Sequence, residues 1–104
     1  MVVKAAEMKM ETRSAWRGGD GAIGCRHLAP QGNPPKWRFA AVLEFDPGDS
    51  IGEHVHSGET ELYYIMEGTG TVWDNGAPVE VGPGDAIFTG GGAAHSIKNT
   101  GEGV

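Results

Sequence analysis

The chain has 104 residues, with 8 Lys and Arg against 14 Asp and Glu, which gives a formal net charge of −6 at pH 7. This length suits one domain, and oligomerisation would help a core of this size. The acidic balance and the lack of any Lys/Arg cluster argue against nucleic acid or an anionic membrane as a partner. The 18 glycines show no triplet period, and 38% hydrophobic residues disfavour disorder.

The N-terminal segment carries charges where a signal peptide needs an apolar stretch. No apolar run approaches the roughly 18 residues that a membrane span needs. Cys25 is the single cysteine of the sequence, so it cannot form an internal disulfide. From these features we expect a cytoplasmic protein.

In chain order, residues 1–36 are expected to form an N-terminal arm that belongs to the same domain as the rest. Residues 1–21 are read as an arm leading into a loop, residues 22–28 as a short strand, and the Pro- and Gly-rich stretch after them as a loop. From residue 37 apolar and other residues alternate up to the turn Asp46-Pro47-Gly48-Asp49. This alternation predicts a strand of about nine residues, 37–45.

Six further short strands follow, each bounded by turn residues. They are expected at 51–55, 61–66, 70–73, 77–81, 86–88 and 95–98. Asn75-Gly76 predicts a tight hairpin, because a type I′ turn requires positive φ at both central residues. Many short strands with no helical periodicity predict an all-β barrel or sandwich.

Three of the four histidines fall within the second half of the chain, near one carboxylate. His54 and His56 are two residues apart, so on a strand both point to the same face. Glu61 stands on the returning strand, and His95 begins a later one. Three imidazoles and a carboxylate suit Mn, Fe, Ni, Co, Cu or Zn, and a six-coordinate metal would keep two positions open. The alternative is a coincidence of residues that bind no metal.

These residues carry a resemblance to the cupin superfamily. The first motif reads Gly48-DSIGE-His54-Val55-His56-SGET-Glu61-LYYIME-Gly68, and the second reads Gly84-DAIFT-Gly90-Gly91-Gly92-AA-His95-SIK-Asn99. One departure is Gly90, where the motif has proline, and this change leaves the ligand positions intact. The resemblance implies a single cupin-type jelly-roll β-barrel over residues 37–104, usually dimeric. It also implies one divalent metal, with Mn or Fe first and Zn, Ni, Co or Cu as alternatives, held by His54, His56, Glu61 and His95.

Within the superfamily, the chain resembles small single-domain cupins of the oxalate-decarboxylase-like group. In the two-domain decarboxylases an Arg precedes the first motif His by three residues, whereas here that position is Ile51. We expect a metal-dependent decarboxylase or oxidoreductase that acts on a small carboxylate-bearing or oxygen-rich substrate. One alternative is a non-catalytic binding or sensing cupin. Another is a cupin-type sugar-phosphate isomerase, which would require more cationic side chains in the cavity.

Several further side chains receive expected roles. Arg38 is a candidate substrate anchor, and Tyr63 shares the face of Glu61 and is expected to line the cavity. Glu59 is expected to be a loop carboxylate, because the motif spacing selects Glu61. His27 has no spaced partner and is interpreted as a packed or solvent-facing residue. Large apolar residues are expected in the core or an interface; these are Trp37, Leu62, Tyr64, Met66, Trp73 and Phe88.

Only five residues follow Asn99. Cupins normally continue into a further strand after the second motif, and that strand closes the barrel. We therefore expect the gap to be covered by the N-terminal residues or by a partner subunit, in a homodimer.

Overall fold

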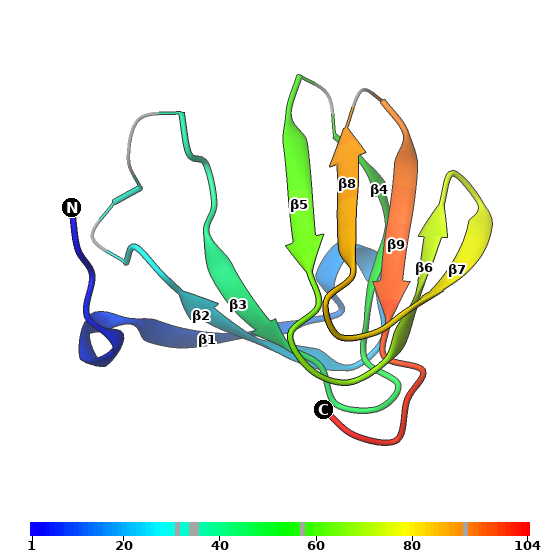
Figure 1. Ribbon diagram of the computed structural model, residues 1–104, viewed down its shortest axis with the longest axis horizontal. Helices are drawn as coiled ribbons and strands as arrows, with labels where there is room; N and C mark the ends of the chain where they lie inside the picture. Colours follow the sequence, from blue (N-terminus) through cyan, green and yellow to red (C-terminus); the bar gives the residue numbers. More distant parts are fainter. Residues whose placement is uncertain (31, 34–35, 57, 91) are drawn as a thin grey trace.

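The structure is a computed structural model that describes residues 1–30, 32–33, 36–56, 58–90 and 92–104. In these residues it contains strands and two 3-10 turns, and no α-helix, which confirms the all-β expectation (Figure 1). No helix in the described ranges is long and apolar enough to cross a membrane. The elements are η1 (Ala5–Glu7), β1 (Lys9–Ser14), η2 (Trp16–Gly18), β2 (Ala22–His27), β3 (Ala41–Glu44), β4 (Ser50–Val55), β5 (Thr60–Tyr64), β6 (Gly70–Asp74), β7 (Ala77–Val81), β8 (Ala86–Gly90) and β9 (Ala94–Lys98).

The strands form three antiparallel sheets. Their orders are β1-β2-β3, β4-β9-β6-β7 and β5-β8. In Figure 1 the second and third sheets stand close together, and the sheet of β1 to β3 extends away from them. The buried core contains residues from two of the sheets: Ile23 from the first, and Ile51, Val72, Val81 and Ile97 from the second. The N-terminal segment thus contributes to the core through Ile23.

The N-terminal segment contains more strand than expected. The strand predicted at 22–28 is confirmed as β2, but residues 9–14, expected to belong to an arm, form β1 along its edge. This segment also lies tightly on β4: a Cβ at Gly52 would be 2.0 Å from the carbonyl oxygen of Arg17, and one at Gly19 would be 2.1 Å from that of Ser50. Glycine is required at both positions because only hydrogen fits there.

The strand predicted at 37–45 was too long, since β3 covers only Ala41–Glu44. Before it, the carbonyl of Arg38 accepts a hydrogen bond from the side-chain amide of Asn33 at 2.8 Å, instead of a bond from a neighbouring strand. The Phe39 ring packs edge-on against Trp16 and His27. The alternation of apolar and polar residues did not reveal that Arg38 and Phe39 contact side chains instead of pairing with a neighbouring strand.

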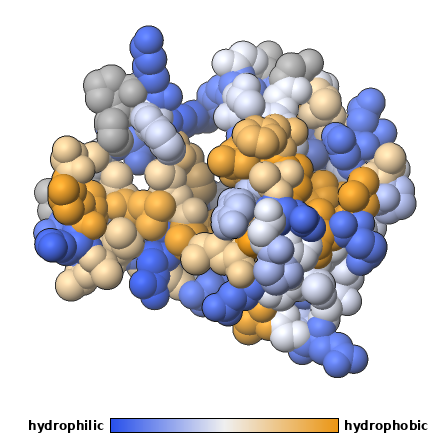
Figure 2. All heavy atoms as spheres, in the orientation of Figure 1, coloured by the Kyte–Doolittle hydropathy of each residue, from blue (hydrophilic) through white to orange (hydrophobic). Residues whose placement is uncertain are grey.

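Two aromatic residues expected in the core are exposed, and a third is half-buried. Trp37 is 63% exposed and Phe88 is 71% exposed, whereas Trp73 is partly covered. Phe88 pairs in register with Leu62, and both project outward from the two-stranded sheet. We call the exposed residues Leu62, Tyr64, Met66 and Phe88 the β5–β8 outer face. Figure 2 shows hydrophobic surface over β5 and β8 on the side facing the viewer.

Two local features follow the sequence closely. Asn75 and Gly76 have φ of 51° and 85°, as the predicted type I′ hairpin between β6 and β7 requires. Asn99 ties the end of the second motif to the start of the first, because its N–H donates to the carbonyl of Asp49 and its carbonyl accepts from the N–H of Gly48. Its buried side chain also donates to the carbonyls of Phe45 and Gly103.

Candidate metal centre

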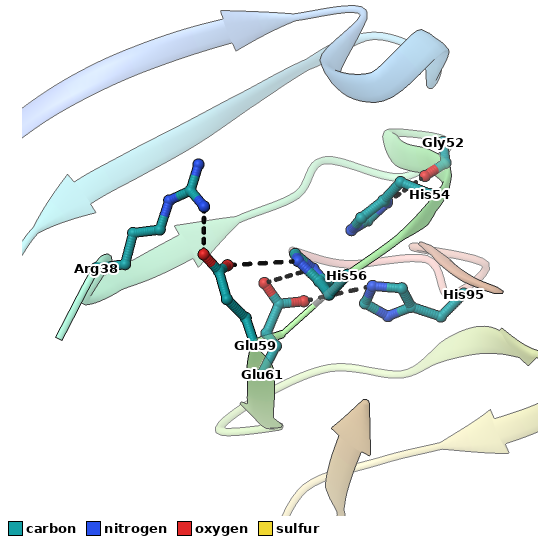
Figure 3. A network of polar contacts seen from close by, with 7 residues as sticks. All are labelled: Arg38, Gly52, His54, His56, Glu59, Glu61 and His95. Atoms are coloured by element: carbon teal, nitrogen blue, oxygen red, sulfur yellow. Dashed lines mark hydrogen bonds and ion pairs between the residues drawn. The ribbon is translucent and has the colours of Figure 1, made fainter. Parts of the chain in front are cut away.

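The four side chains expected to bind metal come from neighbouring parts of the barrel. His54 lies on β4, His56 directly after it, Glu61 on β5 and His95 on β9. One ligand atom from each lies within 4.8 Å of the others. Figure 3 shows the three imidazoles and the Glu61 carboxylate turned toward one another. We call this group the metal centre.

A β-bulge in β4 allows His54 to point inward. Ile51 pairs with Ile97 across the ladder, whereas His54 pairs with His95, so β4 carries one residue more than β9 between these pairs. In a regular strand, residues three apart point to opposite faces. The bulge turns His54 to the face of buried Ile51, and such bulges commonly re-aim a side chain beside a functional site.

The hydrogen bond of His54 fixes its tautomer. Its Nδ1 lies 2.7 Å from the carbonyl oxygen of Gly52. A carbonyl can only accept, so Nδ1 carries the proton and donates it. Nε2 is then left with a free lone pair, as in metal-ligating histidines whose second nitrogen is held by the protein.

Several buried polar atoms at the centre have no hydrogen-bond partner among the described residues. They are Nε2 of His56, Oε1 of Glu61 and Nε2 of His95, together with the hydroxyl of Thr89. Glu61 lies 3.4 Å from His56 Nε2 through one oxygen and 3.6 Å from His95 Nε2 through the other. Unpaired buried polar atoms are costly, and a shared cation would satisfy three of them at once. The residues therefore fit a bound metal ion.

Burial also affects the protonation of the side chains around the centre. His95 is 2% exposed, and burial, followed by the nearby His54, lowers its pKa. This favours the neutral imidazole, the form that binds metal. Tyr63 lies beside it, with ring centroids 5.9 Å apart, and burial and the Glu61 carboxylate raise the pKa of its phenol. Tyr63 therefore stays a neutral hydrogen-bond donor.

Arg38 and Glu59 form the outer part of the network in Figure 3. The Arg38 guanidinium is bound to the Glu59 carboxylate, and the side chain of Arg38 is 78% exposed. The other oxygen of Glu59 lies 3.9 Å from Nδ1 of His56. Arg38 thus reaches the centre through Glu59, and its expected role as substrate anchor stays a prediction. The contact between Glu59 and His56 was not expected from the sequence, although the position of Glu59 three residues after His56 in a tight loop was a usable signal.

Ser57 and Gly91, which belong to the two motifs, lie outside the described residues.

Comparisons with known proteins identify relatives of this chain. The family described as the cupin domain matches residues 41–104. The oxalate-binding protein of Thermotoga maritima is 43% identical over 102 residues, covering 97% of this chain and 84% of that protein. The crystal structure of a predicted oxalate decarboxylase from Thermotoga maritima superposes with a TM-score of 0.88 and 41% identity, covering 99% of this chain and 90% of that chain.

A more distant similarity is to the quercetin 2,3-dioxygenase of Bacillus subtilis, which is 32% identical over 73 residues. That match covers 70% of this chain and 22% of the enzyme, so it concerns a small part of a longer protein.

Proposed function

The chain belongs to the cupin family, and from this premise we propose that it binds a divalent metal at the metal centre and, through it, a small dicarboxylate of the oxalate class. The observation that carries the proposal is the convergence of unpaired, buried ligand atoms of His56, Glu61 and His95. The ligand set admits several divalent metals with open positions, and the likeness to cupins puts Mn or Fe first. When bound, such a metal acts as a Lewis acid that polarises a carboxylate oxygen.

The residues around the centre support a small, anionic ligand. Tyr63 supplies a neutral phenol that can donate a hydrogen bond to a carboxylate oxygen. Arg38 offsets the charge of Glu59 at the rim, so that a dianion approaching the centre meets less repulsion. The relatives named for oxalate, which this chain matches over nearly its full length, point to the same substrate class.

We further propose that the bound dicarboxylate is turned over by decarboxylation. The C–C bond breaks, one carbon leaves as carbon dioxide, and the other takes up a proton to become formate, so the reaction needs no external oxidant. Oxidative chemistry with dioxygen is the second form of this proposal, and the similarity to a dioxygenase favours it. Binding without turnover is the rival function, which the name of the oxalate-binding relative favours.

The test loads metal-free protein with Mn²⁺ and measures oxalate binding by calorimetry. We expect His56→Ala to lose Mn²⁺ binding and oxalate binding together while its circular dichroism stays unchanged. Glu53→Gln is the matched control, because Glu53 is exposed on the same strand between Gly52 and His54 and projects away from the centre. Oxalate binding that survives in His56→Ala would contradict the proposal.

Formate and carbon dioxide are then assayed from Mn-loaded protein and oxalate, under nitrogen and under air. Formate together with carbon dioxide supports decarboxylation, whereas carbon dioxide without formate, released under air alone as dioxygen is reduced, supports the oxidative form. Binding with no product under either gas identifies a binding protein.

We also propose that the protein is a homodimer that buries the β5–β8 outer face. The four side chains of this face are between 55% and 71% exposed in the single chain. Contiguous apolar patches of this kind are uncommon on monomers, and a second copy would cover them. A small core also benefits from the added burial.

A further inference from the structure

A second group of metal-ligating side chains lies on the β1–β2 hairpin, which contributes no residue to the metal centre. Glu11 on β1 stands directly opposite Cys25 on β2 in the antiparallel register. His27 is two residues beyond Cys25, so both project from the same face of β2. Ligand atoms of the three residues lie within 4.8 Å of one another. His27, interpreted from the sequence as a residue without a partner, therefore has two.

The distances within this group match those of a tetrahedral site. Sγ of Cys25 and Oε2 of Glu11 each lie 3.7 Å from Nε2 of His27. Around zinc, with bonds of about 2.3 Å to sulfur and about 2.1 Å to nitrogen and oxygen, tetrahedral geometry separates sulfur from nitrogen by about 3.6 Å and nitrogen from oxygen by about 3.4 Å. The distance from Glu11 to His27 is longer than a good hydrogen bond between oxygen and nitrogen. The distance from Cys25 to His27 lies at the upper limit for a hydrogen bond to sulfur.

Arg13 holds the carboxylate in a suitable orientation. Its guanidinium binds Oε1 of Glu11 and leaves Oε2 facing His27. The guanidinium carbon lies 4.4 Å from the Trp16 ring centroid and 5.1 Å from that of Phe39, so Arg13 is itself held by packing. The hydrogen bond from Arg13 also lowers the pKa of Glu11 and keeps it ionised. Such an outer partner is typical of metal-ligating carboxylates.

A catalytic Cys-His-Glu relay explains the group less well. A relay uses one imidazole nitrogen toward the thiol and the other toward the carboxylate, whereas here Nε2 faces both. Cys25 is 0% exposed, so a substrate does not reach its sulfur. Burial also raises the pKa of the Cys25 thiol, which makes it a poor nucleophile.

We propose that Glu11, Cys25 and His27 form a second metal site, specific for a thiophilic divalent cation of the Zn²⁺ class, which fastens β1 to β2. Thiolate and imidazole ligands select such cations over Mn²⁺. The three protein ligands leave one position for a non-protein ligand, and the partly exposed side chains of His27 and Glu11 give the cation a path of entry. The site takes no part in the proposed dicarboxylate chemistry.

Cobalt tests this site separately from the metal centre. Cobalt bound by a thiolate shows an intense sulfur-to-metal charge-transfer band in the near ultraviolet, and Cys25 is the only cysteine in the sequence. The metal centre contains no sulfur and cannot give this band. We expect metal-free protein titrated with Co²⁺ under reducing conditions to develop the band. Added Zn²⁺ should displace the bound Co²⁺ and abolish the band. The band should persist in His56→Ala, whose metal centre is damaged.

Variants then identify the ligands. Cys25→Ser should abolish the band, His27→Ala should weaken Co²⁺ binding roughly a hundredfold, and Glu11→Gln should weaken it by roughly tenfold. Glu44→Gln, a carboxylate-to-amide change in the same sheet at a residue that pairs with Gly24, should have no effect. The proposal is wrong if the wild-type protein shows no band, or if the band and affinity are unchanged in both His27→Ala and Glu11→Gln. A band that grows with protein concentration and saturates at one cobalt for every two chains would also contradict the proposal, because the cobalt would then be shared between two chains.

Discussion

His54 and His95 face each other as register partners across β4 and β9, with ring centroids 4.1 Å apart. Two imidazoles at this distance have little attraction for each other. A cation bound by a nitrogen of each would hold the two rings together. The relationship therefore links the stability of the β4–β9 ladder to metal binding.

Metal binding should raise thermal stability. A ligand present at about a hundred times its Kd stabilises the folded state by about 2.7 kcal/mol. For a domain of this size that corresponds to a rise in Tm of roughly 10 °C or more. We expect Mn²⁺ to produce this rise, a chelator to remove it, and His95→Ala to lack it, as measured by calorimetry. Glu53→Gln should respond like the wild type; an equal rise in His95→Ala would contradict the assignment of His95.

Gly52→Ala should destabilise the fold and disturb the metal centre. The new Cβ would stand 2.0 Å from the Arg17 carbonyl oxygen, so η2 or β4 must move, and β4 carries the bulge that orients His54. We expect a loss of about 3 kcal/mol or more in the free energy of unfolding, measured with urea, and weaker Mn²⁺ binding. Gly103→Ala is the control, because a Cβ there meets no atom within 4 Å.

Charges on the β5–β8 outer face should separate the dimer. We expect Leu62→Glu and Phe88→Glu to sediment as monomers, since a buried carboxylate without a partner opposes association. Val79→Glu places the same charge at a half-exposed valine on β7 and should leave the assembly unchanged. A wild-type protein that sediments as a monomer at high concentration would contradict the proposed interface.

Arg38→Ala should weaken oxalate binding and leave the metal in place. Its charge offsets Glu59 at the rim, and without it the Glu59 carboxylate repels a dianion. We expect oxalate affinity to fall by about tenfold, which is about 1.4 kcal/mol, with unchanged Mn²⁺ affinity. Arg38→Ala combined with Glu59→Gln should recover most of the loss. Failure of this rescue would mean that Arg38 acts in another way.

The sequence was sufficient for the features that depend on short spacings. The pair His54 and His56, the carboxylate Glu61 and the Asn75-Gly76 hairpin all follow from periodicity or turn chemistry within a few residues. His95 was grouped with them only as the third histidine in the second half of the chain, and the resemblance to cupins then implied its role as a ligand across a distance that no local pattern bridges.

Other features depend on contacts between distant residues and could not be read from local patterns. The bulge in β4 is defined only by its register with β9. The alternation of residues 37–45 predicted too long a strand. Alternation shows which residues can form a strand, but it does not show where a neighbouring strand is present to pair with them. The group of Glu11, Cys25 and His27 arises from the pairing of β1 with β2, although Cys25 and His27 at alternate positions of one strand were a visible signal.

The hydrogen bonds of Asn99 with Gly48 and Asp49 bring together the two ends of the stretch that carries every residue of the metal centre. The centre therefore lies on a segment whose ends meet, while Glu11, Cys25 and His27 lie on chain that precedes it. No ligand of one group lies on the stretch of chain that carries the other. Substitutions can therefore remove either group of ligands while leaving the residues of the other in the sequence.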